Sequence, residues 1–138
     1  SPVYFSYPNG QVISLLNRSL FPIYSYFYKD GKPDMVPHAK KFSGLIYAMN
    51  CKEEEMEKFH YPELLGTWGK TMDLVYGDNE VQYCCNTYQY NDYSRYRQNL
   101  FDEADKKRQW EEVFPKDLKK AYDLGMRLTR MAVEDRKK

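Results

Sequence analysis

The sequence is poor in the residues and motifs that carry enzyme chemistry. It has only two histidines, His38 and His60, and neither belongs to a metal or protease motif such as H-E-x-x-H. It also lacks a G-x-S-x-G motif, a P-loop and a dinucleotide fingerprint. Its carboxylates fall in runs typical of helix surfaces, and only a glycosidase, which needs just two acids, is compatible with them. We therefore expect a protein that is not an enzyme and that binds no metal or cofactor.

The sequence has few cysteines, and their number is odd. Cys51, Cys84 and Cys85 allow at most one intrachain disulfide and leave a thiol that is free or intermolecular. That count determines neither the pairing nor the cellular compartment. The opening Ser-Pro shows no signal-peptide pattern, which fits a processed mature chain or a trimmed one. Asn17-Arg18-Ser19 is a glycosylation sequon, which is used only if the chain is secreted and the site exposed.

Long hydrophobic runs and a surplus of either charge are also missing. No run approaches the roughly 20 apolar residues that cross a bilayer. The 21 basic and 20 acidic residues leave a net charge of +1, so we expect little attraction to phosphate and no nucleic-acid partner. Leu, Ile, Val and Phe together make only 28 of the 138 residues. Low net charge argues against disorder, so tyrosine is expected to fill core positions, where each buried hydroxyl needs a hydrogen-bond partner.

Aromatic residues are what the sequence has in excess, and they gather in two stretches. The segment SLFPIYSYFYKD, residues 19–30, has five rings between positions 21 and 28, and YCCNTYQYNDYSRY, residues 83–96, has five tyrosines. The apolar and aromatic residues of positions 20–28 cover more than one face of a helix, so a core cannot take them all. An exposed aromatic cluster marks a contact with a membrane or another protein. The candidate insertion residues are Phe21, Tyr24, Phe27 and Tyr28.

The apolar spacing predicts an all-α fold, a single domain of residues 1–138 built as a bundle of about five helices. Apolar residues recur every three or four positions over 13–27, 39–59, 62–75, 93–104 and 115–132. Pro22 predicts a kink or break, Asp30–Asp34 a turn, and Pro62 and Pro115 helix starts. In the last helix the residues expected to face inward are Leu118, Ala121, Tyr122, Leu128 and Ala132. Only residues 83–90 are ambiguous between helix and strand.

Charge is unevenly spread behind the neutral total. Residues 1–50 carry five basic and two acidic groups, residues 51–94 three and nine, and residues 95–138 thirteen and nine. Five basic residues share one side of the last predicted helix, which is either a solvated face or a contact surface for an anionic partner. They are Lys116, Lys119, Lys120, Arg127 and Arg130.

Several short motifs resemble the abalone acrosomal sperm proteins, the family of lysin and its fusagenic paralogue. Asp92-Tyr93-Ser94-Arg95 resembles an Asp-Tyr-Thr-Arg stretch that opens a late lysin helix, and Phe114-Pro115-Lys116 resembles lysin's Ile-Pro-Lys. Gly31-Lys32 and Lys40-Lys41 match a Gly-Arg and a Lys-Lys pair at nearly the same separation. The similarity needs gaps in several places, including about five residues between Arg95 and Pro115, and covers most of the chain thinly.

The resemblance implies a small, all-helical, enzymatically inert protein that is secreted from the sperm acrosomal vesicle. Lysin is strongly basic and opens the egg envelope without bond cleavage, whereas the fusagenic paralogue acts at the sperm and egg membranes. This near-neutral chain, with Asp117 and Asp123 in its basic helix, fits the fusagenic relative better. The expected function is thus membrane perturbation in sperm–egg fusion, with lipids as partners. Two alternatives stay open: lysin-type binding of egg-envelope glycoprotein, and a secreted helical carrier of an apolar ligand.

Overall fold

The computed structural model describes residues 1–137 and shows a mixed α/β fold, so the expected five-helix all-α bundle is wrong. Its centre is a strand–helix–strand unit: β5 (Ser43–Ala48), α2 (Tyr61–Tyr76) and β6 (Asn79–Cys84). The two strands pair in parallel, from Ser43 with Asn79 to Ala48 with Cys84. Residues 39–59, predicted as one helix, instead contain β5 and the short 3₁₀ turn η1 (Glu53–Glu55).

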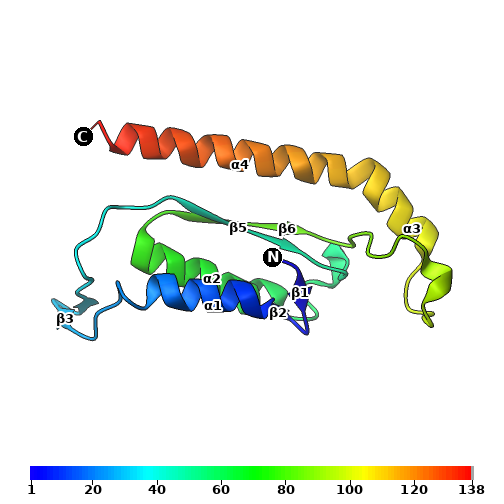
Figure 1. Cartoon of the computed structure of the whole chain (residues 1–138), viewed down its shortest axis with the longest axis horizontal. Helices are drawn as coiled ribbons and strands as arrows, with labels where there is room; N and C mark the ends of the chain where they lie inside the picture. Colours follow the sequence, from blue (N-terminus) through cyan, green and yellow to red (C-terminus); the bar gives the residue numbers. More distant parts are fainter. Residues whose placement is uncertain (138) are drawn as a thin grey trace.

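Helices cover both faces of this two-stranded sheet. On one face lies α2, with α1 (Gly10–Leu20) beyond it, and on the other lies the long α4 (Phe114–Asp135) (Figure 1). A short α3 (Glu103–Arg108) and a π-helical turn, η3 (Gln109–Val113), lead into α4. Two small hairpins complete the chain, β1 (Val3–Tyr4) with β2 (Tyr7–Pro8), and β3 (Tyr28–Lys29) with β4 (Lys32–Pro33).

The main hydrophobic core lies between the sheet, α2 and α1. Tyr47 is fully buried there and its hydroxyl donates to the Leu65 carbonyl oxygen at 3.2 Å, as expected of a buried tyrosine. Burial raises the pKa of Tyr47 to about 12. Gly69 lets α2 approach β6 closely, because a Cβ at that position would lie 2.8 Å from Val81 Cγ2. The other buried members of this core are Leu16, Leu20, Leu45, Met49, Met56, Leu65, Met72, Val75 and Cys85.

Local signals in the sequence predicted several boundaries well. Pro62 occupies the first turn of α2, and Gly77 ends that helix with a positive φ of 116°. α1 ends at Leu20, just before Pro22, so the predicted break there is confirmed. All three cysteines are unpaired, and burial raises the pKa of the Cys85 thiol to about 12.

Candidate membrane interface

The first aromatic stretch lies in the loop that leads from α1 to the β3–β4 hairpin. Of the four predicted insertion residues, Phe21, Phe27 and Tyr28 are exposed by 65%, 76% and 63%. Tyr24 is half-buried instead: it packs against the core and meets Tyr26 edge-on, with ring centroids 5.7 Å apart. Tyr26, which was not among the four, is 80% exposed. The stretch therefore presents four rings to solvent and one to the core.

Local sequence explains how this stretch is presented. Asn9 caps α1 by accepting a hydrogen bond from the Val12 N–H at 2.9 Å. Leu16 and Leu20 are the buried residues of this helix, so they define the side that packs on the core. At the far end Asp30 and Gly31 both have positive φ, the geometry of a two-residue hairpin turn for which Asp-Gly is a preferred sequence. The chain between these two fixed points carries the exposed rings.

The β1–β2 hairpin adds an aromatic tip that the sequence pattern did not predict. Tyr4, Phe5 and Tyr7 are all exposed, and Phe5 completely so. Phe5 and Ser6 hold left-handed conformations, with φ of 48° and 68°, which are unfavourable for residues other than glycine, asparagine and aspartate. The turn between the two strands has no Gly, Asn or Asp to signal it. Phe5 combines an unfavourable backbone conformation with a fully exposed ring, so it does not stabilise the fold. Strained residues of this kind are found at functional sites.

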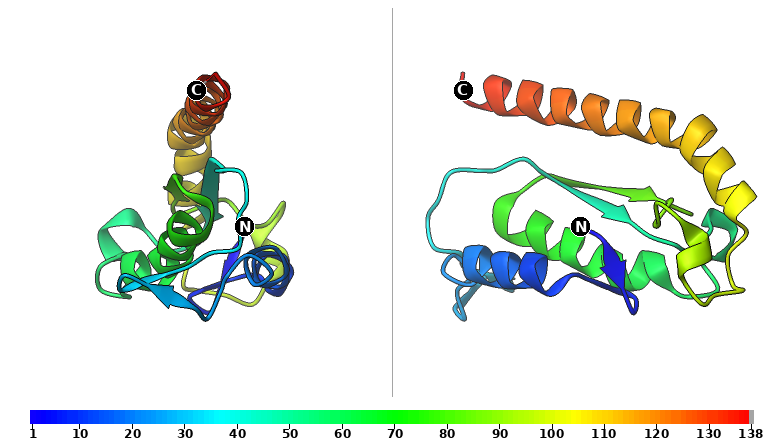
Figure 2. Two further views of the ribbon diagram at one scale, coloured as in Figure 1. Left: turned by 90° about the vertical axis from the view of Figure 1, so that its left-hand side faces the viewer. Right: turned by 45° about the vertical axis from the view of Figure 1, so that its right-hand side comes forward.

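The two hairpins lie on the same side of the molecule, with α1 between them. In all three views both hairpins and α1 lie on the side of the sheet opposite α4 (Figures 1 and 2). We call their exposed rings, together with Phe21, the aromatic face. Within residues 1–28 the only charged side chain is Arg18, and the β3–β4 hairpin adds the exposed charges Lys29, Asp30, Lys32 and Asp34, which sum to zero. The members of the aromatic face are Tyr4, Phe5, Tyr7, Phe21, Tyr26, Phe27 and Tyr28.

The five predicted basic residues all lie exposed on α4, and three of them are held in ion pairs. Lys119 pairs with Asp123, Lys120 Nζ lies 3.5 Å from Asp117 Oδ1, and Arg127 Nη2 lies 2.7 Å from Glu80 Oε2. Lys116 and Arg130 make no ion pair with any residue between 1 and 137. These two are therefore the predicted cations most available to an anionic partner.

An exposed apolar row runs along α4 beside these cations. Leu118 and Tyr122 were expected to face inward, but they are 55% and 65% exposed, so that expectation is wrong. The sheet covers a narrower part of the helix, centred on Asp117 and Leu124. We call the row and the cations beside it the α4 outer face. The exposed apolar residues in it are Phe114, Leu118, Tyr122, Met126 and Val133.

The aromatic face and the α4 outer face lie on opposite sides of the molecule. α4 forms the top in every view, and in the end-on view no other element flanks it (Figure 2). The sheet and α2 separate α4 from α1 and the hairpins (Figure 1). The sequence led us to expect rings and cations against one membrane, whereas the structure separates the two groups.

The second aromatic stretch takes no part in either surface. Tyr83 stacks on Tyr47 in the main core, and the other rings pack around Tyr93, which is buried and lies 5.1 Å from Tyr88 and 5.0 Å from Tyr90 between ring centroids. The hydroxyl of Tyr93 accepts the Gln89 N–H at 3.1 Å. Tyr90 and Tyr96 stack with centroids 4.0 Å apart. This stretch is a small satellite core rather than a contact surface.

Neither a metal site nor a membrane-spanning helix is found among the described residues. No group of three or more His, Cys, Asp or Glu side chains within residues 1–137 is arranged to hold a metal ion. None of the helices in that range is both long and apolar enough to cross a bilayer.

Comparison with known proteins returns no relative of this chain. No protein-family model matches it, and searches of curated proteins and of solved structures likewise give no significant match. The resemblance to acrosomal sperm proteins therefore stays a prediction that rests on its short motifs. The function has to be argued from the geometry of the two surfaces.

Proposed function

We propose that this protein is a non-enzymatic, membrane-binding protein that draws two membranes together. The observation that carries the proposal is the pair of exposed apolar surfaces that point in opposite directions, the aromatic face and the α4 outer face. The resemblance to fusagenic sperm proteins supplies the setting, a secreted acrosomal protein acting in sperm–egg membrane fusion. That setting rests on the motifs alone, because the all-helical fold that the resemblance implied is not the fold of this chain.

The aromatic face suits the interfacial region of a bilayer. Tyrosine and phenylalanine combine a large apolar body with, in tyrosine, a polar tip, and tyrosine is enriched at membrane–water interfaces. Moving an exposed apolar side chain out of water contributes roughly 1.5–3 kcal/mol. The β1–β2 hairpin and Phe21 lie in residues 1–28, where Arg18 is the only charged side chain, so their insertion requires little desolvation of charge. The tip of the β3–β4 hairpin carries Lys29, Asp30 and Lys32, so its rings insert while these charges stay at the level of the headgroups.

The α4 outer face suits the surface of an anionic bilayer. An amphipathic helix lies in the interface with its apolar side buried and its basic side chains near the headgroups. The row from Phe114 to Val133 supplies the apolar side, and Lys116 and Arg130 supply cations that no described residue neutralises. Each such cation near an anionic surface contributes about 1 kcal/mol. This surface is therefore expected to depend on anionic lipid and on salt, unlike the aromatic face.

The two alternatives make different demands on the structure. A lysin-type protein would use the same surfaces on egg-envelope glycoprotein and would leave liposomes intact. A carrier of an apolar ligand needs an enclosed apolar cavity, whereas a groove of about 750 Å³ in the described part of the chain is open and is lined by ten charged side chains. The membrane proposal uses the exposed rings directly and is preferred for that reason.

Vesicle experiments test the proposal. The purified protein is added to neutral and to anionic liposomes, and binding, turbidity and lipid mixing are followed at several salt concentrations. Binding to both and aggregation of anionic vesicles are expected. The variant Phe27→Ser/Tyr28→Ser is expected to bind neutral vesicles at least about tenfold more weakly. Lys116→Glu/Arg130→Glu is expected to bind neutral vesicles normally but to lose the aggregation of anionic ones.

Matched controls use exposed residues outside both surfaces. Leu74→Ser removes an exposed apolar side chain from α2, and Lys58→Glu/Lys70→Glu reverses two exposed lysines near the same helix. Both are expected to behave like the unaltered protein. Failure of the unaltered protein to bind any liposome would contradict the membrane proposal, and binding to isolated egg envelopes would then support the lysin-type alternative.

A further inference from the structure

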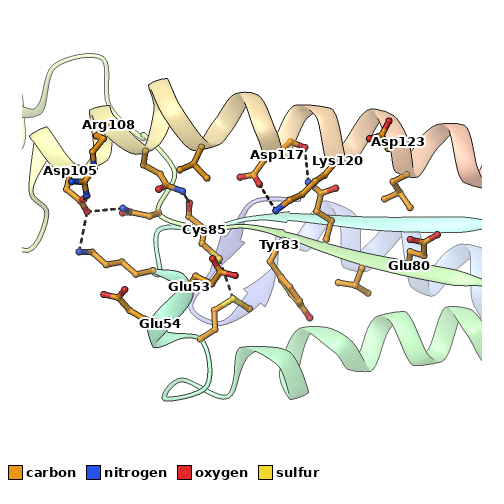
Figure 3. Close-up of a pocket in the computed structure, with 18 of the residues that line it drawn as sticks. Glu53, Glu54, Glu80, Tyr83, Cys85, Asp105, Arg108, Asp117, Lys120 and Asp123 are labelled. Atoms are coloured by element: carbon orange, nitrogen blue, oxygen red, sulfur yellow. Dashed lines mark hydrogen bonds and ion pairs between the residues drawn. The ribbon is translucent and has the colours of Figure 1, made fainter.

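An open groove runs along the outer edge of β6, beneath α4. It measures about 750 Å³, and residues of η1 and α3 line one end while residues of α4 form its upper wall (Figure 3). Glu53, Glu54, Asp105 and Arg108 gather at that end, and Glu80 and Asp123 lie toward the other (Figure 3). This groove belongs to neither of the two membrane surfaces.

The backbone of β6 has unused hydrogen-bonding groups in this groove. At the two ends of the ladder Ser43 N donates to Asp78 O at 3.0 Å and Met49 N donates to Cys84 O at 2.9 Å. In a parallel pair with this register, alternate residues of a strand bond its neighbour, so the N–H and C=O groups of Val81 and Tyr83 point away from β5. Both residues line the groove, and no other strand of the described chain pairs with this edge.

The outer edge of β5, by contrast, already has a partner. Ser1 N donates to Ile46 O at 2.6 Å and Ala48 N donates to Ser1 O at 3.0 Å, so the first residues of the chain pair with it. The N–H of Asn79, at the start of β6, also has a partner, because it donates to Asp73 Oδ1 at 2.6 Å. The unused N–H groups of this edge are therefore those of Val81 and Tyr83, the two outward-facing residues that line the groove.

The charges of the groove indicate what it accepts. Its four cations are all held by its own carboxylates: Lys52 and Arg108 by Asp105, Lys120 by Asp117, and Arg127 by Glu80. Glu53 and Glu54 make no ion pair with a described residue. Six carboxylates against four cations leave a negative surplus at the end formed by η1. The six are Glu53, Glu54, Glu80, Asp105, Asp117 and Asp123.

Asn86 adds an unsatisfied acceptor at the same end. Its side-chain amide donates to Asp105 Oδ2 at 3.0 Å, which fixes the orientation of the amide group. Its Oδ1 is buried and accepts no hydrogen bond, although the residue is only 7% exposed. Asn86 also holds a left-handed backbone conformation, with φ of 52°. Buried unsatisfied oxygens are rare in proteins and mark sites where a donor is missing.

We propose that this groove binds an extended peptide segment that carries lysine or arginine and adds to the sheet as a third strand along β6. The free N–H and C=O groups of Val81 and Tyr83 would pair with the peptide backbone, the general mode of β-strand addition. A basic side chain would meet Glu53 and Glu54. β6 is six residues long, so a peptide of similar length, about 20 Å when extended, matches it. The inference does not depend on the membrane proposal.

The test uses a blocked hexapeptide, Lys-Val-Thr-Val-Thr-Lys, as the probe. Binding is measured by fluorescence anisotropy, and amide hydrogen exchange is followed residue by residue with NMR. Without peptide, Val81 and Tyr83 are expected to exchange faster than Gln82 and Cys84, whose N–H groups bond β5. Saturating peptide is expected to slow Val81 and Tyr83 by at least about tenfold, since exchange then requires the added strand to leave.

Two peptide controls separate strand addition from charge attraction. Replacing both lysines by glutamate is expected to weaken binding by about tenfold or more. In the bound peptide every second residue would donate its N–H to β6. N-methylation of these residues removes the donors and is expected to abolish binding, whereas N-methylation of the residues between them is tolerated. Equal effects of the two sets would overturn the strand-addition geometry.

Protein variants complete the test. Glu53→Lys/Glu54→Lys is expected to weaken binding of the lysine peptide and to strengthen binding of the glutamate peptide, while Glu57→Lys/Glu63→Lys, on exposed residues outside the groove, changes neither. Three results would overturn the proposal: absence of peptide binding, binding without slower exchange at Val81 and Tyr83, and a dimer in which these amides are already protected. The last would assign the edge to a second copy of the chain.

Discussion

The two aromatic stretches of this chain each contain five rings, but most rings of the first are exposed and most rings of the second are packed. Residues 88–96 form a satellite core in which Tyr93 is buried between Tyr88 and Tyr90. Residues 21–28 leave Phe21, Tyr26, Phe27 and Tyr28 in solvent. The difference comes from what surrounds each stretch. The second begins at the end of β6 and lies against η3, with Gln109 Nε2 donating to Cys85 O at 3.2 Å, whereas the first spans an open end of the molecule.

Aromatic content therefore predicts neither burial nor contact by itself. A ring is buried when other elements close over it, and it remains available when the chain turns outward between two fixed points. The exposed stretch is the one to test for binding, and the buried stretch the one to test for stability. Three experiments sharpen this contrast, and the one with the largest expected effect comes first.

Removing the central ring of each stretch is expected to separate stability from binding. Tyr93→Ala deletes a buried ring together with the acceptor of the Gln89 N–H, and we expect the free energy of unfolding to fall by about 3–5 kcal/mol. Phe27→Ala removes a ring that is 76% exposed and should change it by less than about 0.5 kcal/mol. Urea denaturation followed by far-UV circular dichroism measures both. A large loss from Phe27→Ala would show that the first stretch is packed in solution.

A buried charged residue, Lys106, lies near the second aromatic stretch, and its burial is expected to make stability depend on pH. Lys106 is 3% exposed and donates to Asn50 O at 3.2 Å, and burial lowers its pKa to about 8. Between about pH 8 and 9 the folded chain then binds fewer protons than the unfolded chain, so Lys106 makes stability rise with pH by about 1 kcal/mol. The buried thiols of Cys84 and Cys85, whose pKa values burial raises, act in the opposite direction and begin to do so within the same pH range, so the contribution of Lys106 is measured as a difference between proteins.

The measurement is the free energy of unfolding at about pH 8 and about pH 9 in the unaltered protein and in Lys106→Met. From about pH 8 to about pH 9 the change in this free energy is expected to be more positive in the unaltered protein than in Lys106→Met, by about 1 kcal/mol. Lys107→Met, at the exposed neighbouring position, is the matched control and should behave like the unaltered protein. An equal change in all three proteins would show that Lys106 titrates normally in the folded chain.

Substitutions of Phe5, at the tip of the β1–β2 hairpin, measure how much its backbone conformation lowers the free energy of unfolding. Phe5→Gly is expected to raise the free energy of unfolding by about 1 kcal/mol, because glycine adopts a positive φ freely. Phe5→Ala keeps the strain and should give no such gain. Both variants lack the ring, so both should bind neutral vesicles more weakly. Unchanged vesicle binding in both would remove Phe5 from the aromatic face.

Parts of the fold and site were predictable because their causes are local. Pro62 and Gly77 delimit α2 through backbone geometry alone, and the Asp30–Gly31 turn follows from the same kind of preference. Rings in 20–28 cover too many directions to be buried together, which indicated that some of them are exposed, and Phe21, Tyr26, Phe27 and Tyr28 are. Which ring is buried could not be predicted, because the chain there is a loop that folds Tyr24 back onto the core rather than a helix with a regular face.

The sequence by itself determined where α2 starts and stops, where α1 breaks, and that the first aromatic stretch exceeds what a core can hold. Proline, glycine and crowded apolar spacing act within a few residues, so these results need no knowledge of distant segments. Only the tertiary structure decided that Ser43–Ala48 pairs with Asn79–Cys84, that Leu118 and Tyr122 face solvent, and that rings and cations lie on opposite sides. A strand is stabilised by hydrogen bonds to a segment remote in sequence, and which part of a helix is buried depends on the surface it packs against.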